Sequence, residues 1–153
     1  MAFFTDLYSQ FHELHDDLAK VIDDLPLEAL DWVPGAEMNS IAVLIVHLCG
    51  AERYWLGDVA LGDPSGRVRE EEFKTRGLTA DELGQRLAAA DEYARQALSR
   101  LSPASLDSIR VSPRDGKAFP LGACLTYVLK HSALHLGHIQ ITRQLWEQKG
   151  KQA

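Results

Sequence analysis

The sequence has few cysteines and no long hydrophobic run. Only two of its 153 residues are cysteine, Cys49 and Cys124, and both lie in apolar helical patterns where small buried thiols are common. A disulfide-stabilised fold is therefore not indicated. The longest nearly apolar run, Ile41 to Cys49, is far too short to cross a bilayer. The first residues also lack the features of a signal peptide, so we expect a cytoplasmic protein with no membrane partner.

Basic residues are also scarce. The chain has 16 Lys and Arg against 22 Asp and Glu, which gives a formal net charge of -6. This charge opposes binding to polyanions, and no dense local group of Lys and Arg compensates for it. We therefore expect no nucleic-acid partner.

Four segments carry apolar residues at helical spacing and are expected to form helices. They cover about residues 3–25, 41–61, 80–101 and 120–149. Pro26 ends the first helix, and Asn39 or Ser40 is a suitable N-cap for the second. Thr79 and Glu82 have the spacing of a capping box at the start of the third.

The segments between these helices are rich in Gly, Pro and charged residues. Residues 26–40 are expected to form a connection and residues 62–78 an irregular loop. The segment between the third and fourth helices contains the turn signal Arg-Asp-Gly-Lys, which favours a short hairpin. Pro120, which follows, is suited to the first turn of the last helix. The sequence thus predicts an all-α four-helix bundle with two long connections, forming a single domain over residues 1–153.

Three histidines fall close together in the last expected helix. His131, His135 and His138 occupy consecutive positions of a line that steps by four and three residues, so all three are expected to face the bundle core. Imidazoles four residues apart can bind one ion, and zinc binds neutral imidazole well. The spacing does not choose among the three, because His135 pairs with either neighbour.

A fourth histidine strengthens the metal hypothesis. His47 is the only polar residue in Ile-Ala-Val-Leu-Ile-Val-His-Leu-Cys, so it is expected to be buried and to need a polar or metal partner. Bundle ligands commonly project inward from facing helices, so His47 can meet the pair on the last helix. Three protein ligands leave the coordination sphere open, as in catalytic sites. The alternative is a buried, hydrogen-bonded histidine cluster without metal.

Few other residues qualify for a role at this site. His15 lies near the apolar stripe of the first helix and is a candidate substrate contact or fourth ligand, whereas His12 is expected to be exposed. Glu52 lies five positions beyond His47, too far round the helix to reach the same ion. No carboxylate base can be identified, so the catalytic residues stay unassigned.

Two segments resemble the DinB/YfiT-like family. They are MNSIAVLIVHLCGAERYWLGDVALG and LTYVLKHSALHLGHIQITRQLW. The resemblance implies a four-helix bundle, a homodimer, and a divalent ion, zinc or nickel, held by three histidines. Carried over by position, the ligands would be His47, His131 and His135. Many members have Gln where this chain has His138, which would then be a second-shell donor, a substrate contact or a competing ligand.

The family includes thiol-dependent enzymes such as mycothiol-dependent maleylpyruvate isomerase and S-transferases. A three-histidine metal can lower the pKa of bound water or bind a thiol as thiolate. The resemblance therefore implies either thiol-dependent transfer or isomerisation, with a low-molecular-weight thiol as cofactor, or metal-assisted hydrolysis of a small-molecule substrate. The non-enzymatic alternative is a metal-stabilised dimeric bundle or interaction protein.

Overall fold

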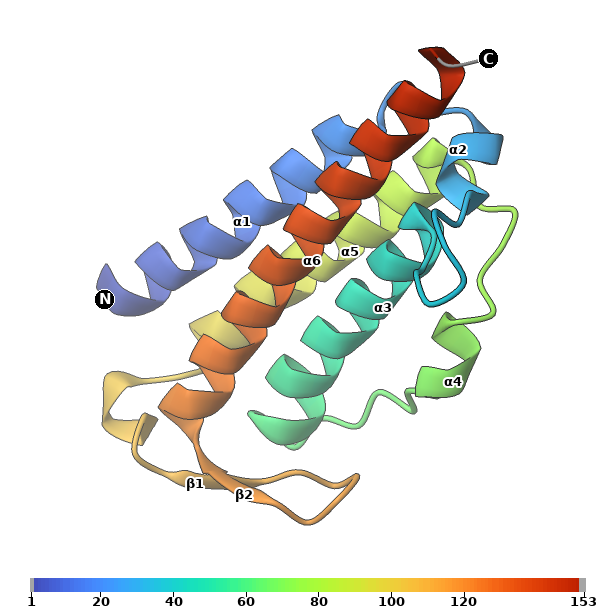
Figure 1. Ribbon diagram of the computed structural model, residues 1–153. Helices are drawn as coiled ribbons and strands as arrows, with labels where there is room; N and C mark the ends of the chain where they lie inside the picture. Colours follow the sequence, from blue (N-terminus) through green and yellow to red (C-terminus); the bar gives the residue numbers. More distant parts are fainter. Residues whose placement is uncertain (1, 152–153) are drawn as a thin grey trace.

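The computed structural model describes residues 2–151 and is built around four long helices. They are α1 (Ala2–Ile22), α3 (Ile41–Arg53), α5 (Ala80–Ser99) and α6 (Leu121–Lys151). α1 and α3 each pack against both α5 and α6, with α6 in front and α5 behind in the view of Figure 1. The four-helix bundle expected from the sequence is therefore confirmed. The connections from α1 to α3 and from α5 to α6 both cross a diagonal of this bundle.

The predicted helix starts agree with the structure. Ser40 is the N-cap of α3, and its side chain accepts a hydrogen bond from the backbone N–H of Val43. Thr79 and Glu82 form the reciprocal hydrogen bonds of a capping box at the start of α5. Each cap satisfies backbone donors that the first turn of a helix leaves without a partner.

Short elements occupy the connections. The segment after Pro26, expected to be a connection, contains α2 (Leu27–Asp31), because burial of Ala29 and Leu30 in the core favours one helical turn there. The charged loop after α3 likewise contains α4 (Arg69–Glu72). The Arg-Asp-Gly-Lys segment forms the predicted hairpin, preceded by a short 3-10 helix. These last elements are η2 (Pro103–Ser105), β1 (Ile109–Val111) and antiparallel β2 (Ala118–Pro120).

The second predicted helix, expected to run to about residue 61, changes form before it ends. α3 continues into a π-helical segment, η1 (Tyr54–Val59). Gly57 lies in this segment, and a Cβ atom there would be 1.7 Å from Arg53 Nη1. The absence of a side chain at Gly57 therefore lets the Arg53 guanidinium lie against the helix.

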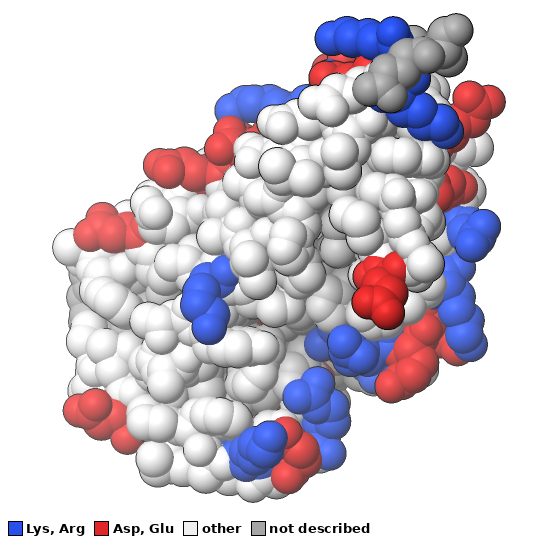
Figure 2. All heavy atoms as spheres, in the orientation of Figure 1, with Lys and Arg blue, Asp and Glu red and all other residues white. Residues whose placement is uncertain are grey.

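The apolar core has two main clusters, one towards each end of the bundle. One is built around Leu18, Ile45 and Leu87, and the other around Phe11 and Leu125. Within residues 2–151, no helix combines the length and the apolar character needed to cross a bilayer. Figure 2 shows a hollow between α4 and the β1–β2 hairpin, with basic side chains on both sides of it.

Candidate metal centre

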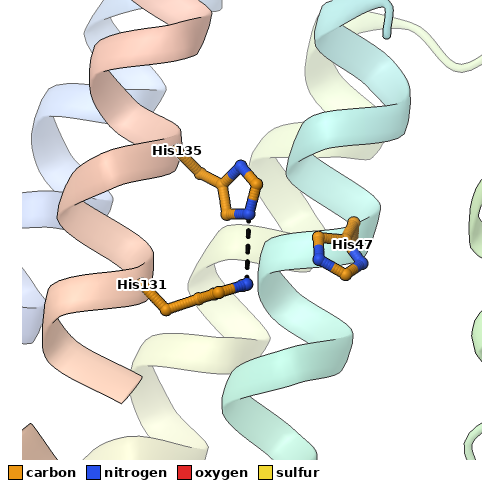
Figure 3. A group of neighbouring side chains, drawn as sticks. All are labelled: His47, His131 and His135. Carbon is orange, nitrogen blue, oxygen red and sulfur yellow. Dashed lines mark hydrogen bonds between the residues drawn. The ribbon is translucent and has the colours of Figure 1, made fainter. Parts of the chain in front are cut away.

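The structure brings together His47 on α3 with His131 and His135 on α6. One ring nitrogen of each lies within 4.8 Å of the others, and Figure 3 shows the three imidazoles around the space between the two helices. The Nε2 atoms of His131 and His135 are 3.1 Å apart. Two nitrogens bound to one tetrahedral zinc ion are about 3.3 Å apart. The pair is therefore already spaced as two ligands of one ion.

A carboxylate on α4 orients His47. The Nδ1–H of His47 donates to Glu72 Oε2 over 2.8 Å, which leaves Nε2 available to an ion. Arg67 donates to both oxygens of Glu72, from Nε over 2.5 Å and from Nη2 over 2.8 Å. Burial alone would raise the pKa of Glu72, but the hydrogen bonds from Arg67 and His47 outweigh it and lower that pKa. An ionised carboxylate behind a histidine is the arrangement that usually supports a metal ligand.

The two histidines of α6 are suited to binding metal. Burial, reinforced by the positive charges around them, lowers the pKa of His131 and of His135 to about 4. Both imidazoles are therefore neutral at pH 7, which is the form that binds a metal ion. Their Nδ1 atoms are buried and have no hydrogen-bond partner among the described residues. With Nδ1 protonated on both rings, the two Nε2 lone pairs face each other over 3.1 Å, and a divalent ion between them would accept both, so the donor set fits a divalent ion.

His138 does not face the core, contrary to the expectation for all three histidines of this helix. Its side chain is exposed, although its ring lies 5.6 Å from that of His135. The physical reason is that a seven-residue repeat drifts by about 20° per heptad on a straight α-helix. The buried line on α6 passes through Ser132 and Ile139. A role for His138 towards substrate stays a prediction.

His15 belongs to a different set of buried polar side chains. Its Nε2 lies 2.7 Å from Glu52 Oε2, and its Nδ1 lies 3.2 Å from Asp91 Oδ1. Glu52 in turn accepts a hydrogen bond of 2.6 Å from Ser132. Both ring nitrogens of His15 are thus used by carboxylates, and Glu52 faces His15 rather than the three histidines. His15 as a substrate contact stays a prediction.

Sequence reasoning missed Glu72 and Arg67. Both lie in the charge-rich segment 62–78, which has the composition of an irregular solvated loop. The burial expected for His47 implied a polar partner, but the sequence offers three consecutive glutamates on α4. Only the fold distinguishes Glu72, which is buried, from Glu70 and Glu71, which are exposed.

Comparison with known proteins adds a family and a fold. A model of the DinB superfamily matches residues 10–139. The comparison with curated protein sequences found no match. A conserved protein from Enterococcus faecalis has a similar structure, with a TM-score of 0.76 and 14% identity over 95% of this chain and 97% of that chain.

Two further solved structures are similar. YfiT from Bacillus subtilis, described as a probable metal-dependent hydrolase with an unusual four-helix bundle topology, gives a TM-score of 0.71 and 14% identity over 96% of this chain and 87% of that one. A histidine-to-alanine mutant of a mycothiol-dependent maleylpyruvate isomerase gives 0.66 and 12% identity over 89% of this chain. The match spans 60% of the isomerase chain. At these identities the likeness shows a shared fold.

Proposed function

This chain belongs to the DinB superfamily, and we propose that it is a metal-dependent enzyme whose divalent ion is held by His47, His131 and His135. The observation that carries the proposal is the convergence of one ring nitrogen from each histidine within 4.8 Å. The neutral imidazoles on α6 and the carboxylate behind His47 support it. Zinc and nickel are the expected metals.

In the proposed site the ion supplies the chemistry, and the protein residues hold and orient the ion. A divalent ion held by three histidines supplies Lewis acidity, which lowers the pKa of a water or thiol bound to it. Glu72 keeps the proton of His47 on Nδ1 and so keeps Nε2 directed at the ion. α6 holds His131 and His135 one helical turn apart, which fixes the spacing of the other two ligands.

The class of reaction we propose is either hydrolysis or a thiol-dependent transfer or isomerisation. Two of the three similar structures are described as a probable metal-dependent hydrolase and a mycothiol-dependent maleylpyruvate isomerase. Burial raises the pKa of both thiols of this chain, Cys49 and Cys124, so neither is a thiolate at neutral pH. A thiol-dependent reaction would therefore use an external low-molecular-weight thiol.

Metal content tests the ligand assignment. We expect about one equivalent of zinc or nickel in protein purified without an affinity column, and much less in His47→Ala and His135→Ala, because two ligands hold the ion poorly. His138→Ala, on the same helix, is the matched control and should keep the wild-type content. Elemental analysis gives the content, and circular dichroism checks the fold. Less than about a tenth of an equivalent in the wild type would contradict the proposal.

Activity assays test whether the site is catalytic. The metal-loaded protein should turn over a substrate in a screen of low-molecular-weight thiols with electrophiles, or in an esterase and amidase panel. His135→Ala should lose that activity. Loss of thermal stability on chelation, with no turnover in either screen, would instead support a purely structural ion.

A further inference from the structure

A cavity of about 530 Å³ lies next to the side chains that pack against His47, and Arg67 is part of its lining. Its wall is formed by η1, the segment after η1, the first residue of α4 and the turn of the hairpin. Three arginines line it, Arg67, Arg69 and Arg114, together with a single acidic side chain, that of Asp58. The hollow in Figure 2 has basic side chains on both sides. This local excess of positive charge contrasts with the net charge of -6 of the whole chain.

Two arginines of the cavity lining approach His47. Arg67 Nη2 lies 3.4 Å from Nδ1 of His47. The guanidinium of Arg69 lies 4.7 Å from the centre of the Phe73 ring, and that ring is 5.1 Å from the imidazole of His47. These two arginines of the cavity are thus separated from His47 by no more than one side chain, so a small molecule held by them can extend past Phe73 towards the histidines.

Two of the three arginines are not neutralised by a close carboxylate. Arg67 is bound to both oxygens of Glu72. Among the described residues Arg69 forms no ion pair, and the only acidic contact of Arg114 is Asp115, at 3.9 Å. Asp58, the acidic residue of the wall, accepts hydrogen bonds from the backbone N–H and the hydroxyl of Ser65. The guanidinium N–H donors of Arg69 and Arg114 are thus available to bind an anion.

The wall of the cavity is held by specific hydrogen bonds. Tyr54 lies beneath two of the arginines, with the guanidinium carbons of Arg67 and Arg114 at 5.8 and 5.6 Å from its ring. The Tyr54 hydroxyl lies 2.7 Å from Ser112 Oγ and accepts the backbone N–H of Arg114. These contacts join η1 to the turn of the hairpin, so the position of Arg114 is coupled to that of Tyr54.

We propose that the substrate of this site is a small molecule bearing a carboxylate, which Arg69 and Arg114 bind while the reacting end lies at the histidines. The inference rests on the proposed function, because it names the substrate class of the same site. A guanidinium matches the two oxygens of a carboxylate with parallel N–H donors, which makes arginine the usual residue for such recognition. For a thiol-dependent reaction, the carboxylate can belong to the thiol or to its partner substrate.

Calorimetric titration of the metal-loaded protein tests this inference. The probes are succinate, glutarate and adipate, each matched with its uncharged diamide, and inorganic phosphate as a separate arm. We expect the dicarboxylates to bind and the diamides not to bind. Arg69→Gln and Arg114→Gln should each weaken binding of the best dicarboxylate about tenfold or more, since each removes a charge-assisted contact. Arg76→Gln, at an exposed arginine outside the cavity lining, is the matched control and should change nothing.

Three results would overturn the inference. They are diamides binding as well as dicarboxylates, both arginine variants binding like the wild type, and phosphate binding more tightly than every dicarboxylate. Metal content measured on the same samples separates this inference from the proposed function. Arginine-dependent dicarboxylate binding by a chain that holds no metal contradicts only the metal proposal. A full equivalent of metal with arginine-independent binding contradicts only the carboxylate inference.

Discussion

At the scale of single residues, Glu72 makes the two ring nitrogens of His47 different: one donates a hydrogen bond and the other is free to bind an ion. Glu72 accepts the Nδ1–H, so Nε2 is the atom left for an ion. Arg67 keeps Glu72 ionised and fixed, and so acts on the proposed metal site through two intervening side chains. The carboxylate that sequence reasoning could not find is therefore a positioning group for a ligand.

Replacement of Glu72 by glutamine tests this role. Glu72→Gln keeps the shape of the side chain but removes its charge, so we expect metal affinity to fall about 10- to 100-fold, as for other outer-shell partners of metal-bound histidines. Competition with a fluorescent zinc chelator measures the affinity. Glu70→Gln, on the same helix but exposed, is the matched control. Equal affinity in the wild type and Glu72→Gln would show that His47 is oriented without the carboxylate.

At the scale of elements, the form of η1 depends on one glycine. The Arg53 guanidinium, packed where a side chain at Gly57 would be, donates to the backbone oxygen of Asp63 and to its carboxylate. The Tyr93 hydroxyl donates to the same carboxylate. The segment that leads to the cavity wall is thus attached to the bundle by Arg53 and Tyr93, and Gly57 leaves the space that both side chains occupy.

A pair of glycine substitutions tests the packing of η1. In Gly57→Ala the new Cβ would meet Arg53 Nη1 at 1.7 Å and the Tyr93 hydroxyl at 2.6 Å. We expect the free energy of unfolding to fall by about 1 to 3 kcal/mol. Gly84→Ala, inside α5 with open space around its Cβ, should instead raise it by up to about 1 kcal/mol. Urea unfolding measures both, and a neutral Gly57→Ala would contradict the close packing.

At the scale of the whole molecule, a buried polar layer joins all four long helices. His15 of α1 contacts Glu52 of α3 and Asp91 of α5, and Glu52 accepts a hydrogen bond from Ser132 of α6. Along each helix these residues fall between the two apolar clusters of the core. The layer therefore couples the positions of α3 and α6, the two helices that carry the three histidines.

The charge of His15 gives this layer a dependence on pH. Burial alone would lower the pKa of His15, but hydrogen bonds and charges from Glu52 and Asp91 outweigh it and raise that pKa. Such a group adds stability that is fully present below the unfolded pKa of about 6.5 and is lost as the pH rises through the folded pKa. Its contribution to the free energy of unfolding should therefore decrease above about pH 6.5.

Urea unfolding of the wild type and His15→Gln measures that contribution. The wild type should exceed the variant in stability by more at about pH 6 than at about pH 9, because only the lower pH keeps His15 protonated. A chelator present throughout prevents metal binding from adding its own pH dependence. A difference that stays constant across this range would mean that folding leaves the pKa of His15 unchanged, and would contradict the prediction.

At this scale also, two copies of the chain are expected to associate. The homodimer implied by the family resemblance stays a prediction. α6 carries apolar side chains on its outer face as well as in the core, and Leu134, Ile141 and Leu145 are exposed. Polar substitutions of these exposed residues of α6 are therefore the ones that test dimer formation.

The sequence alone was sufficient for the features that depend on local patterns. Apolar spacing predicted the four helices, and Ser40 and the capping box at Thr79 predicted two of their starts because caps are short-range interactions. The histidine spacing on α6 and the apolar surroundings of His47 indicated a histidine site, and the family resemblance selected His131 and His135 as the pair that His47 joins. The seven-residue count misplaced His138, because it does not include the drift of a straight helix.

Only the tertiary structure decided which charged residues act together. Glu72, Arg67, Arg69 and Arg114 lie in segments whose composition is typical of solvated loops, and nothing local separates Glu72 from Glu71. Their grouping depends on where the loop after α3 and the turn of the hairpin meet the bundle. The sequence therefore determined the helices and the histidines, whereas the fold decided what supports them, because contacts between distant segments leave no periodic pattern in the chain.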